Sequence, residues 1–342
     1  MTRAPFALRR ALLRGISHGL LRSLPVLLLA ASGLVRAQAQ AQAQPWPNKP
    51  VRIVIPFSPG GTTDLLARLL AQGLAQNTGQ QFVAENKLGA GGAIAAVEVA
   101  RAPADGSVLF VTTGSTHSIA PALNPNLRYH PVNDFTPLAH LADSDLVWLA
   151  SPSLPAKNIA ELLALARAKP GSINYTSSGV GTAAHLVFEQ FKQQTGVELT
   201  HIPYKGTGGA ISDLMSGVVQ LSLDAVATGL PHTSEGRLRA LAVTGMKRSP
   251  LAPDVATINE TVPGFSVVLW FGLYGPRGIS PEVVQRIHDE VAKVMKSPET
   301  LQRFKAWGIE PGRGMPADFA AMVAADSARW AQLVKDRNIK IE

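Results

Sequence analysis

Residues 53–70 read IVIPFSPGGTTDLLARLL, and this stretch decides the fold. Its first three residues are apolar and β-branched, which is typical of a strand buried on both faces. Two prolines and two glycines in residues 56–61 then predict a tight turn. From Asp64 onward the apolar side chains follow a helical period on one face, at Leu65, Leu66, Leu69, Leu70 and Leu74.

The start of this helix predicts an anion site. Thr62 or Thr63 is the expected N-cap, and the carboxylate of Asp64 would complement the helix dipole. A strand followed by a glycine turn and a helix N-terminus presents free backbone N–H groups beyond the sheet edge. This pattern alone leaves phosphate, nucleotide and carboxylate open.

The first 44 residues have the features of a secretory leader. They contain six arginines and no acidic residue. Five of the arginines precede an apolar run over residues 24–35, and the small residues Ala37 and Ala39 come after this run. A membrane-spanning helix needs about 18 or more apolar residues, so this run is too short to be a permanent anchor. We therefore expect a signal peptide cleaved near residues 37–43, followed by a disordered Gln/Ala-rich start of the mature chain.

Removal of the leader changes the charge argument. The whole chain has 32 basic and 24 acidic side chains, and loss of the six leader arginines brings the net charge from +8 to near +2. With no run of Lys or Arg either, the composition argues against nucleic-acid binding. The chain contains no cysteine, and its eight histidines show no metal-ligand spacing, so we expect no disulfide, metal or cofactor.

The rest of the chain alternates short apolar strands with amphipathic helices, which is typical of a parallel α/β architecture. Two similar α/β sets indicate two lobes, with the chain crossing between them near residues 146–150 and 267–271. Lobe one is expected to comprise residues 45–147 and 270–342, and lobe two residues 148–269. Polar loops follow several strands, and ligands of open α/β sheets bind at such strand ends.

Two nucleotide-site interpretations fail on their details. The loop at residues 58–63 lacks the lysine of a phosphate-binding P-loop. Residues 179–184 fit G-x-G-x-x-A, but the following strand ends in Pro203-Tyr204 rather than in the acid that would hold a ribose. An exported serine hydrolase using Ser115 or Ser178 with His185 stays open as an alternative, although no G-x-S-x-G motif is present.

The order of several motifs resembles one family. Trp46-Pro47 precedes Pro56-Phe57-Ser58-Pro59-Gly60-Gly61-Thr62-Thr63-Asp64, and Glu85-Asn86, Gly89-Ala90-Gly91-Gly92 and Ala104-Asp105-Gly106 follow. Later come residues 177–186 (SSGVGTAAHL), residues 201–206 (HIPYKG) and Pro263-Gly264-Phe265. Across residues 46–342 the chain resembles the extracytoplasmic solute receptors of the tripartite tricarboxylate transporters, the Bug-type periplasmic binding proteins.

This resemblance implies a type II periplasmic binding fold, in which two α/β lobes joined by two crossing strands close on a small carboxylate. It further implies a non-enzymatic, monomeric periplasmic receptor that delivers its ligand to membrane permease subunits. A ligand-sensing partner of a signalling receptor stays open as an alternative. Ala93 and Ser107 depart from the family's usual asparagine and tyrosine.

The resemblance and the anion-site argument together indicate where a ligand would bind. An acid at the end of a lobe-two strand, Asp224, would repel an anionic ligand unless it binds an amine or a hydroxyl. The expected ligand-binding residues are Ser58, Gly60, Gly61, Thr62, Thr63, Asp64, Thr113, Gly114, Ser115, Ser118, Ser177, Ser178, Gly181, Thr182, His185, Tyr204, Lys205, Gly206 and Asp224.

Overall fold

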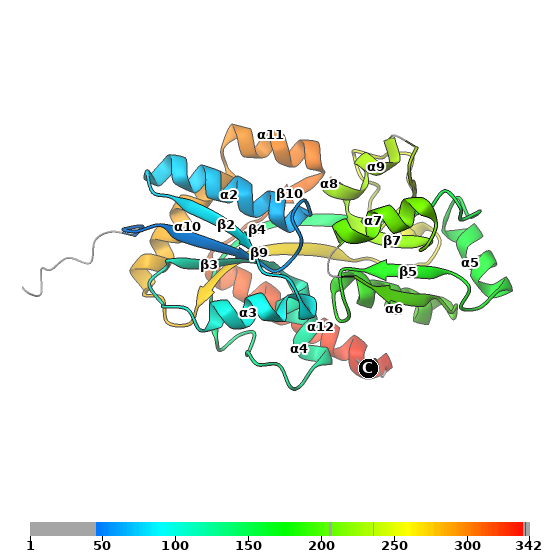
Figure 1. Cartoon of the computed structure of the whole chain (residues 1–342), viewed down its shortest axis with the longest axis horizontal. Helices are drawn as coiled ribbons and strands as arrows, with labels where there is room; N and C mark the ends of the chain where they lie inside the picture. Colours follow the sequence, from blue (N-terminus) through cyan, green and yellow to red (C-terminus); the bar gives the residue numbers. More distant parts are fainter. Residues whose placement is uncertain (1–45, 205–206, 235, 338, 340–342) are drawn as a thin grey trace, which may run out of the picture. The chain divides into compact units, whose positions relative to one another are not determined.

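The computed structural model describes residues 46–204, 207–234, 236–337 and 339 (Figure 1). The predicted leader therefore lies outside the described residues, as do Lys205 and Gly206. The strands are β1 (Val51–Ile55), β2 (Phe82–Asn86), β3 (Val108–Thr113), β4 (Phe135–Ala150), β5 (Asn174–Ser177), β6 (Thr200–Pro203), β7 (Leu221–Ala225), β8 (Arg239–Val243), β9 (Val268–Pro276) and β10 (Ile309–Pro311).

Helices alternate with these strands as the sequence pattern predicts. The longer ones are α2 (Thr62–Thr78), α3 (Ala93–Ala100), α5 (Ile159–Ala168), α6 (Ala183–Thr195), α7 (Thr207–Ser216), α10 (Pro281–Met295), α11 (Pro298–Trp307) and α12 (Pro316–Arg337). Short helical segments are η1 (Ala90–Gly92), η2 (Ser115–Ile119), α4 (Ala120–Leu123), α8 (Val226–Gly229), α9 (Pro231–Ser234) and η3 (Ile258–Glu260). Among the described residues, no helix is both long and apolar enough to cross a membrane.

The strands form two sheets that share β4. In the first, β1 pairs in parallel with β2 and β3, and β9 joins β3 to β4 in antiparallel fashion, with β10 on the far edge of β4. In the second, β4 pairs with β7 and β8, and β5 pairs in parallel with both β7 and β6. The expected α/β architecture, with β-sheets joined by crossing strands, is confirmed.

Strand β4 is longer than expected. The sequence indicated a strand only over residues 146–150, because Pro137 and the polar run Asp143-Ser144-Asp145 interrupt its apolar pattern. In the structure, residues 135–145 pair with β9, with register shifts next to Pro137 and after His140. These irregularities let a proline and an extra residue enter the strand without breaking the ladder.

The two crossings are tied together where β4 leaves one sheet for the other. The buried hydroxyl of Thr244 accepts a hydrogen bond from Leu146 N at 2.9 Å and donates one to Val267 O at 2.7 Å. The backbone of Thr244 also exchanges hydrogen bonds with Leu146 and Val267. The side chain of Thr244 thus couples the crossing of β4 to the chain entering β9. Figure 1 shows β4 and β9 side by side.

Asp145 lies beside this crossing, and its acidity is unusual. Burial, followed by the nearby carboxylates of Glu310 and Asp143, raises the pKa of Asp145 to about 6. A carboxyl group whose folded pKa is raised stabilises the fold at low pH and loses this stabilisation as the pH rises through the folded value.

We therefore expect Asp145→Asn to raise the melting temperature near neutral pH. Allowing for solvent screening of a partly exposed group, the gain is about 1–2 kcal/mol, or a few degrees. The measurement is the melting temperature of variant and wild type at about pH 7.5 and about pH 4, and the difference should shrink at the lower pH because Asp145 is then protonated. An equal difference at both pH values would contradict this assignment.

Separate apolar clusters fill the space around the two sheets. Leu66, Leu70 and Leu74 of α2 are buried against one face of the first sheet, as their spacing predicts. The second sheet packs around Trp148, whose ring lies 4.3 Å from that of Phe188 and 4.7 Å from that of Phe191, measured between centroids. Trp148 and Trp270 are both buried and belong to the cores of the two sheets.

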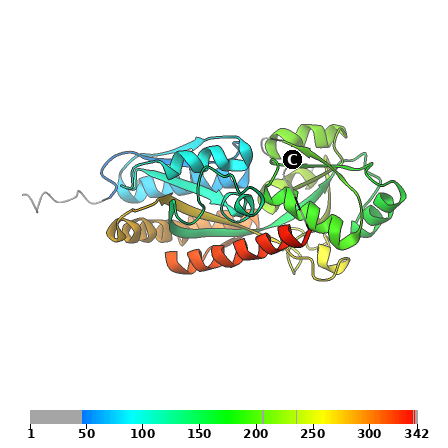
Figure 2. The same cartoon turned by 90° about the horizontal axis from the view of Figure 1, so that it is seen from below.

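Helix α12 contributes to the cores of both sheets. Its Phe319 packs with Phe110 and Trp270 of the first sheet, and its Trp330 belongs to the cluster that contains Trp148. Figure 2 shows this helix (red) running along β4. The C-terminal helix therefore links the two sheets independently of the crossing strands.

Candidate ligand site

The strand–turn–helix unit at residues 53–70 forms as predicted, with one correction. The N-cap of α2 is Gly61 in an extended conformation, with no side-chain cap, so the expectation of a threonine N-cap was wrong. Thr62 and Thr63 instead occupy the first turn with buried side chains. With glycine at the N-cap, no side chain covers the first N–H groups of the helix.

Asp64 holds the turn that precedes α2. Its carboxylate accepts hydrogen bonds from Gly60 N at 3.0 Å, Arg68 Nε at 2.9 Å and Asn86 Nδ2 at 3.0 Å. Burial by itself would raise the pKa of Asp64, but these hydrogen bonds outweigh it and hold the pKa below its usual value. Asp64 therefore stays ionised and fixes the Pro-Gly-Gly turn, beyond its role at the helix dipole.

The segment after β3 is the second part of the chain that contributes to the site. Polar loops were expected after several strands, whereas residues 115–119, which follow β3, form a single helical turn of π type. Thr113 Oγ1 accepts a hydrogen bond from Ser115 N at 3.2 Å, which begins this turn. The prediction of a loop was wrong because a short π-type turn has no distinct hydrophobic period.

Ser115 connects the two sheets. Its hydroxyl accepts a hydrogen bond from Ala183 N, the first residue of α6, at 3.0 Å. Thr182, the N-cap of α6, makes no side-chain cap, and its hydroxyl donates to Gly179 O at 2.8 Å instead. The hydroxyl of Ser115, which follows β3 of the first sheet, thus satisfies the N–H group at the start of α6, which packs on the second sheet. Thr62 and Thr228 make another such contact through their hydroxyls at 3.2 Å.

A cavity of about 80 Å³ lies where these elements meet. It combines the starts of α2 and α6, small hydroxyls and apolar side chains, with Asp224 as the one charged side chain among the residues that line it. The lining residues are Phe57, Ser58, Gly61, Thr62, Thr63, Thr113, Ser115, Leu146, Ser178, Ala183, Ala184, Leu223, Asp224, Ala225, Leu269 and Phe271.

The structure brings part of the predicted site together at this cavity. Ser58, Gly61, Thr62, Thr63, Thr113, Ser115, Ser178 and Asp224 line it directly. The described residues Gly60, Asp64, Gly114, Ser118, Ser177, Gly181, Thr182 and His185 do not line it but belong to the same turns. Tyr204 lines a neighbouring groove of about 320 Å³ with Gly89–Gly92 and residues 178–180.

Sequence reasoning missed the apolar half of the lining, which consists of Phe57, Leu146, Ala183, Ala184, Leu223, Ala225, Leu269 and Phe271. Most of these residues sit in or beside apolar strands, where the pattern gives the same signal for core and for cavity wall. Ala183 and Ala184 could have been found, because they are the first residues of a helix whose start had been assigned to the site.

The serine–histidine contacts do not have the geometry of a hydrolase. Ser115 Oγ accepts from Ala183 N, and His185 Nδ1 accepts from Gly181 N at 3.2 Å. Ser177 Oγ does lie 2.7 Å from His201 Nε2, but Ser177 is fully buried, accepts a hydrogen bond from Gly179 N at 3.1 Å and does not line the cavity. A catalytic serine must reach the substrate as well as the histidine. The described residues also contain no cluster of three His, Cys, Asp or Glu side chains suited to a metal ion.

Comparison with known proteins places the chain in a family. The model of the tripartite tricarboxylate transporter family receptor matches residues 66–339. Rpa4515 of R. palustris with adipate is 38% identical, with a TM-score of 0.83 over 86% of this chain and 99% of that one. The periplasmic binding protein BugD is 33% identical, with a TM-score of 0.83 over 87% of this chain and 100% of that one.

A further solved structure agrees with these. MatC from Rhodopseudomonas palustris with bound malate is 33% identical, with a TM-score of 0.81 over 84% of this chain and 100% of that one. These proteins are solute-binding receptors rather than enzymes, and the expected type II periplasmic binding fold is confirmed. The chain belongs to the receptor family of the tripartite tricarboxylate transporters.

Proposed function

We propose that this protein captures a small carboxylate in the periplasm, in the cavity between its two sheets, and delivers it to a membrane permease. The observation that carries the proposal is the convergence of the starts of α2 and α6 on one cavity, joined by the contact of Ser115 with Ala183 N. Backbone N–H groups at helix starts, together with small hydroxyls, are the donors that a carboxylate requires.

The relatives support a carboxylate as the ligand. Rpa4515 is described with adipate and MatC with malate, and both share the fold at above 30% identity. Half of the lining here is apolar, which suits the carbon chain of such an acid. Asp224, whose Oδ1 accepts from Ala225 N at 2.8 Å, would favour a ligand that places a hydroxyl or an amine beside it.

The proposal includes closure of two lobes, residues 45–147 with 270–342 and residues 148–269. Ligand contacts made in the closed state would shift the equilibrium toward closure. The Ser115–Ala183 and Thr62–Thr228 contacts join the two sheets and would belong to that state. A cleaved signal peptide in residues 1–44 would deliver the protein to the periplasm.

A thermal-shift panel tests the proposed function. The panel contains adipate, malate, citrate, glutamate and benzoate, with the matching amides as uncharged controls. A ligand at about 100 times its Kd stabilises the fold by about 2.7 kcal/mol, which shifts the melting temperature by several degrees. We expect at least one carboxylate to produce this shift and its amide to produce none. If no carboxylate shifts the melting temperature and an ester is hydrolysed, the receptor function is wrong.

A further inference from the structure

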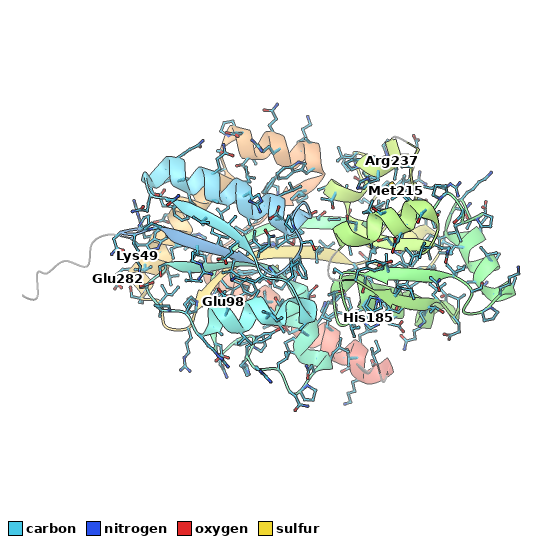
Figure 3. All side chains as sticks on the ribbon, in the orientation of Figure 1. Lys49, Glu98, His185, Met215, Arg237 and Glu282 are labelled. Carbon is cyan, nitrogen blue, oxygen red and sulfur yellow. The ribbon has the colours of Figure 1, made fainter. Side chains whose placement is uncertain are left out.

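Two histidines, one on α6 and one in the second sheet, stack on each other next to the loop of residues 178–182. His185 of α6 (labelled in Figure 3) lies 4.2 Å from His201 of β6 between ring centroids, with the planes 13° apart. Tyr175 of β5 stacks on His201 at 4.9 Å and 18°. His185 is only 7% exposed. Neither histidine lines the cavity, and the function proposed above uses neither of them.

A backbone hydrogen bond fixes the protonation state of His185. Gly181 N donates to His185 Nδ1 at 3.2 Å, so this nitrogen must carry a lone pair. The His185 ring is therefore neutral and holds the loop backbone as an acceptor. His201 Nε2 lies 2.7 Å from the hydroxyl of Ser177, which also lies 2.9 Å from Gly179 O.

The surroundings resist a positive charge on either ring. Burial, followed by the neighbouring His185, lowers the pKa of His201 to about 4. Burial also lowers the pKa of His185, with Glu189 opposing and Lys192 adding to the effect. Glu189 is already engaged by Lys192 Nζ at 2.9 Å and Tyr175 OH at 2.7 Å.

Other elements packed on α6 add few titratable groups. Besides β6, which carries His201, helix α6 packs against β5, β7 and η2, whose titratable side chains are Tyr175, Asp224 and His117. His117 is fully buried, and burial lowers its pKa to about 3, so it stays neutral. Protonation of His185 at Nδ1 would place an N–H opposite Gly181 N–H and break the hydrogen bond between them.

We propose that His185 is a positioning residue, which holds the loop of residues 178–182 through Gly181, and that proton uptake at its Nδ1 releases this loop and weakens ligand binding. The loop carries Ser178, and it leads into Ala183 and Ala184, all of which line the cavity. The inference rests on the proposed function, because the loop matters for binding only if the cavity takes the ligand. Acidification of the periplasm would then favour release.

The test is the affinity for adipate, measured by calorimetry between about pH 7.5 and about pH 4.5. Adipate itself takes up protons in this range, so the measured quantity is the ratio of wild-type to variant affinity at each pH. In His185→Asn the amide oxygen can replace Nδ1 as acceptor but does not titrate. We expect the wild type to lose about fivefold in affinity relative to His185→Asn over this range. His185→Leu, which lacks an acceptor, should bind about tenfold more weakly at neutral pH.

His130→Asn is the matched control. His130 Nδ1 also accepts backbone hydrogen bonds, from Val132 N and Asn133 N, but it lies in an exposed loop away from the cavity. This variant should reproduce the wild-type pH profile. A profile for His185→Asn that is parallel to the wild type, or full affinity in His185→Leu, would overturn the positioning role.

A second measurement needs no ligand. The amide shift of Gly181 in ¹⁵N spectra of the unliganded protein should titrate in the wild type and stay constant in His185→Asn, because its acceptor changes only in the wild type. A constant shift in the wild type would overturn the inference. If no carboxylate of the panel shifts the melting temperature and an ester is hydrolysed, the proposed function and the binding half of this inference both fail, whereas the Gly181 titration still reports on the loop.

Discussion

Gly61→Val is expected to abolish carboxylate binding while the unliganded protein still folds. Gly61 lines the cavity, and a Cβ built on it meets only Ser58 O, at 3.7 Å. Its φ of −78° and ψ of 164° suit a β-branched residue, so the backbone need not move. An isopropyl group directed into a cavity of about 80 Å³ leaves little room for a ligand.

The affinity for the best ligand of the panel should fall by at least about 100-fold. The melting temperature without ligand should fall by only a few degrees, since valine is a poorer N-cap than glycine by about 1 kcal/mol. Gly61→Ala is the graded control and should bind with intermediate affinity. Wild-type affinity in Gly61→Val would mean that the ligand binds elsewhere.

The fold could largely be predicted from the sequence because its strands and helices have different hydrophobic periods. Strand Val51–Ile55 contains the apolar run that indicates it, and helix Thr62–Thr78 contains the helical face predicted from Leu65 to Leu74. The first half of β4 could not be predicted, since residues 135–145 become a strand only through pairing with β9, which is more than a hundred residues away. Tertiary pairing there overrides a local sequence with a proline and three polar residues.

The candidate site, like the fold, could be predicted from the sequence only in part. Glycines and hydroxyls after strands were identifiable because few structural roles other than a turn or a ligand contact require them. The contact of Ser115 with Ala183 N joins two segments 68 residues apart, and no local pattern encodes it. His185 was identified as a site residue, but whether it contacts the ligand or supports the loop depends on which way its ring faces. Only the structure shows Gly181 as its partner.

Of the substitutions proposed for this protein, Gly272→Val should cause the largest loss of stability. Strand propensity alone would predict a gain. Gly272 lies in β9 opposite Thr112 and His140, where valine is ordinarily favoured over glycine. A Cβ at this position would stand 2.1 Å from Cζ of Phe319. The Phe319 ring is 1% exposed and is surrounded by Trp270 and Tyr274, so it has no free volume to enter.

The Phe319 ring must therefore move out of its position, and the packing of α12 against the first sheet is lost as a result. We expect a loss of about 3–5 kcal/mol, as for removal of a buried aromatic ring, measured as a shift in the urea midpoint. Phe319→Ala alone should cost a similar amount. In the double variant the valine occupies part of the vacated space, so the combined loss should be smaller than the sum by at least about 1 kcal/mol. Additive losses would show that Phe319 is not what confines position 272, and a gain in stability would show that strand propensity alone determines the effect of the substitution.

Because α12 also carries Trp330 into the core of the second sheet, a loosened α12 should weaken ligand binding in Gly272→Val even where the protein stays folded.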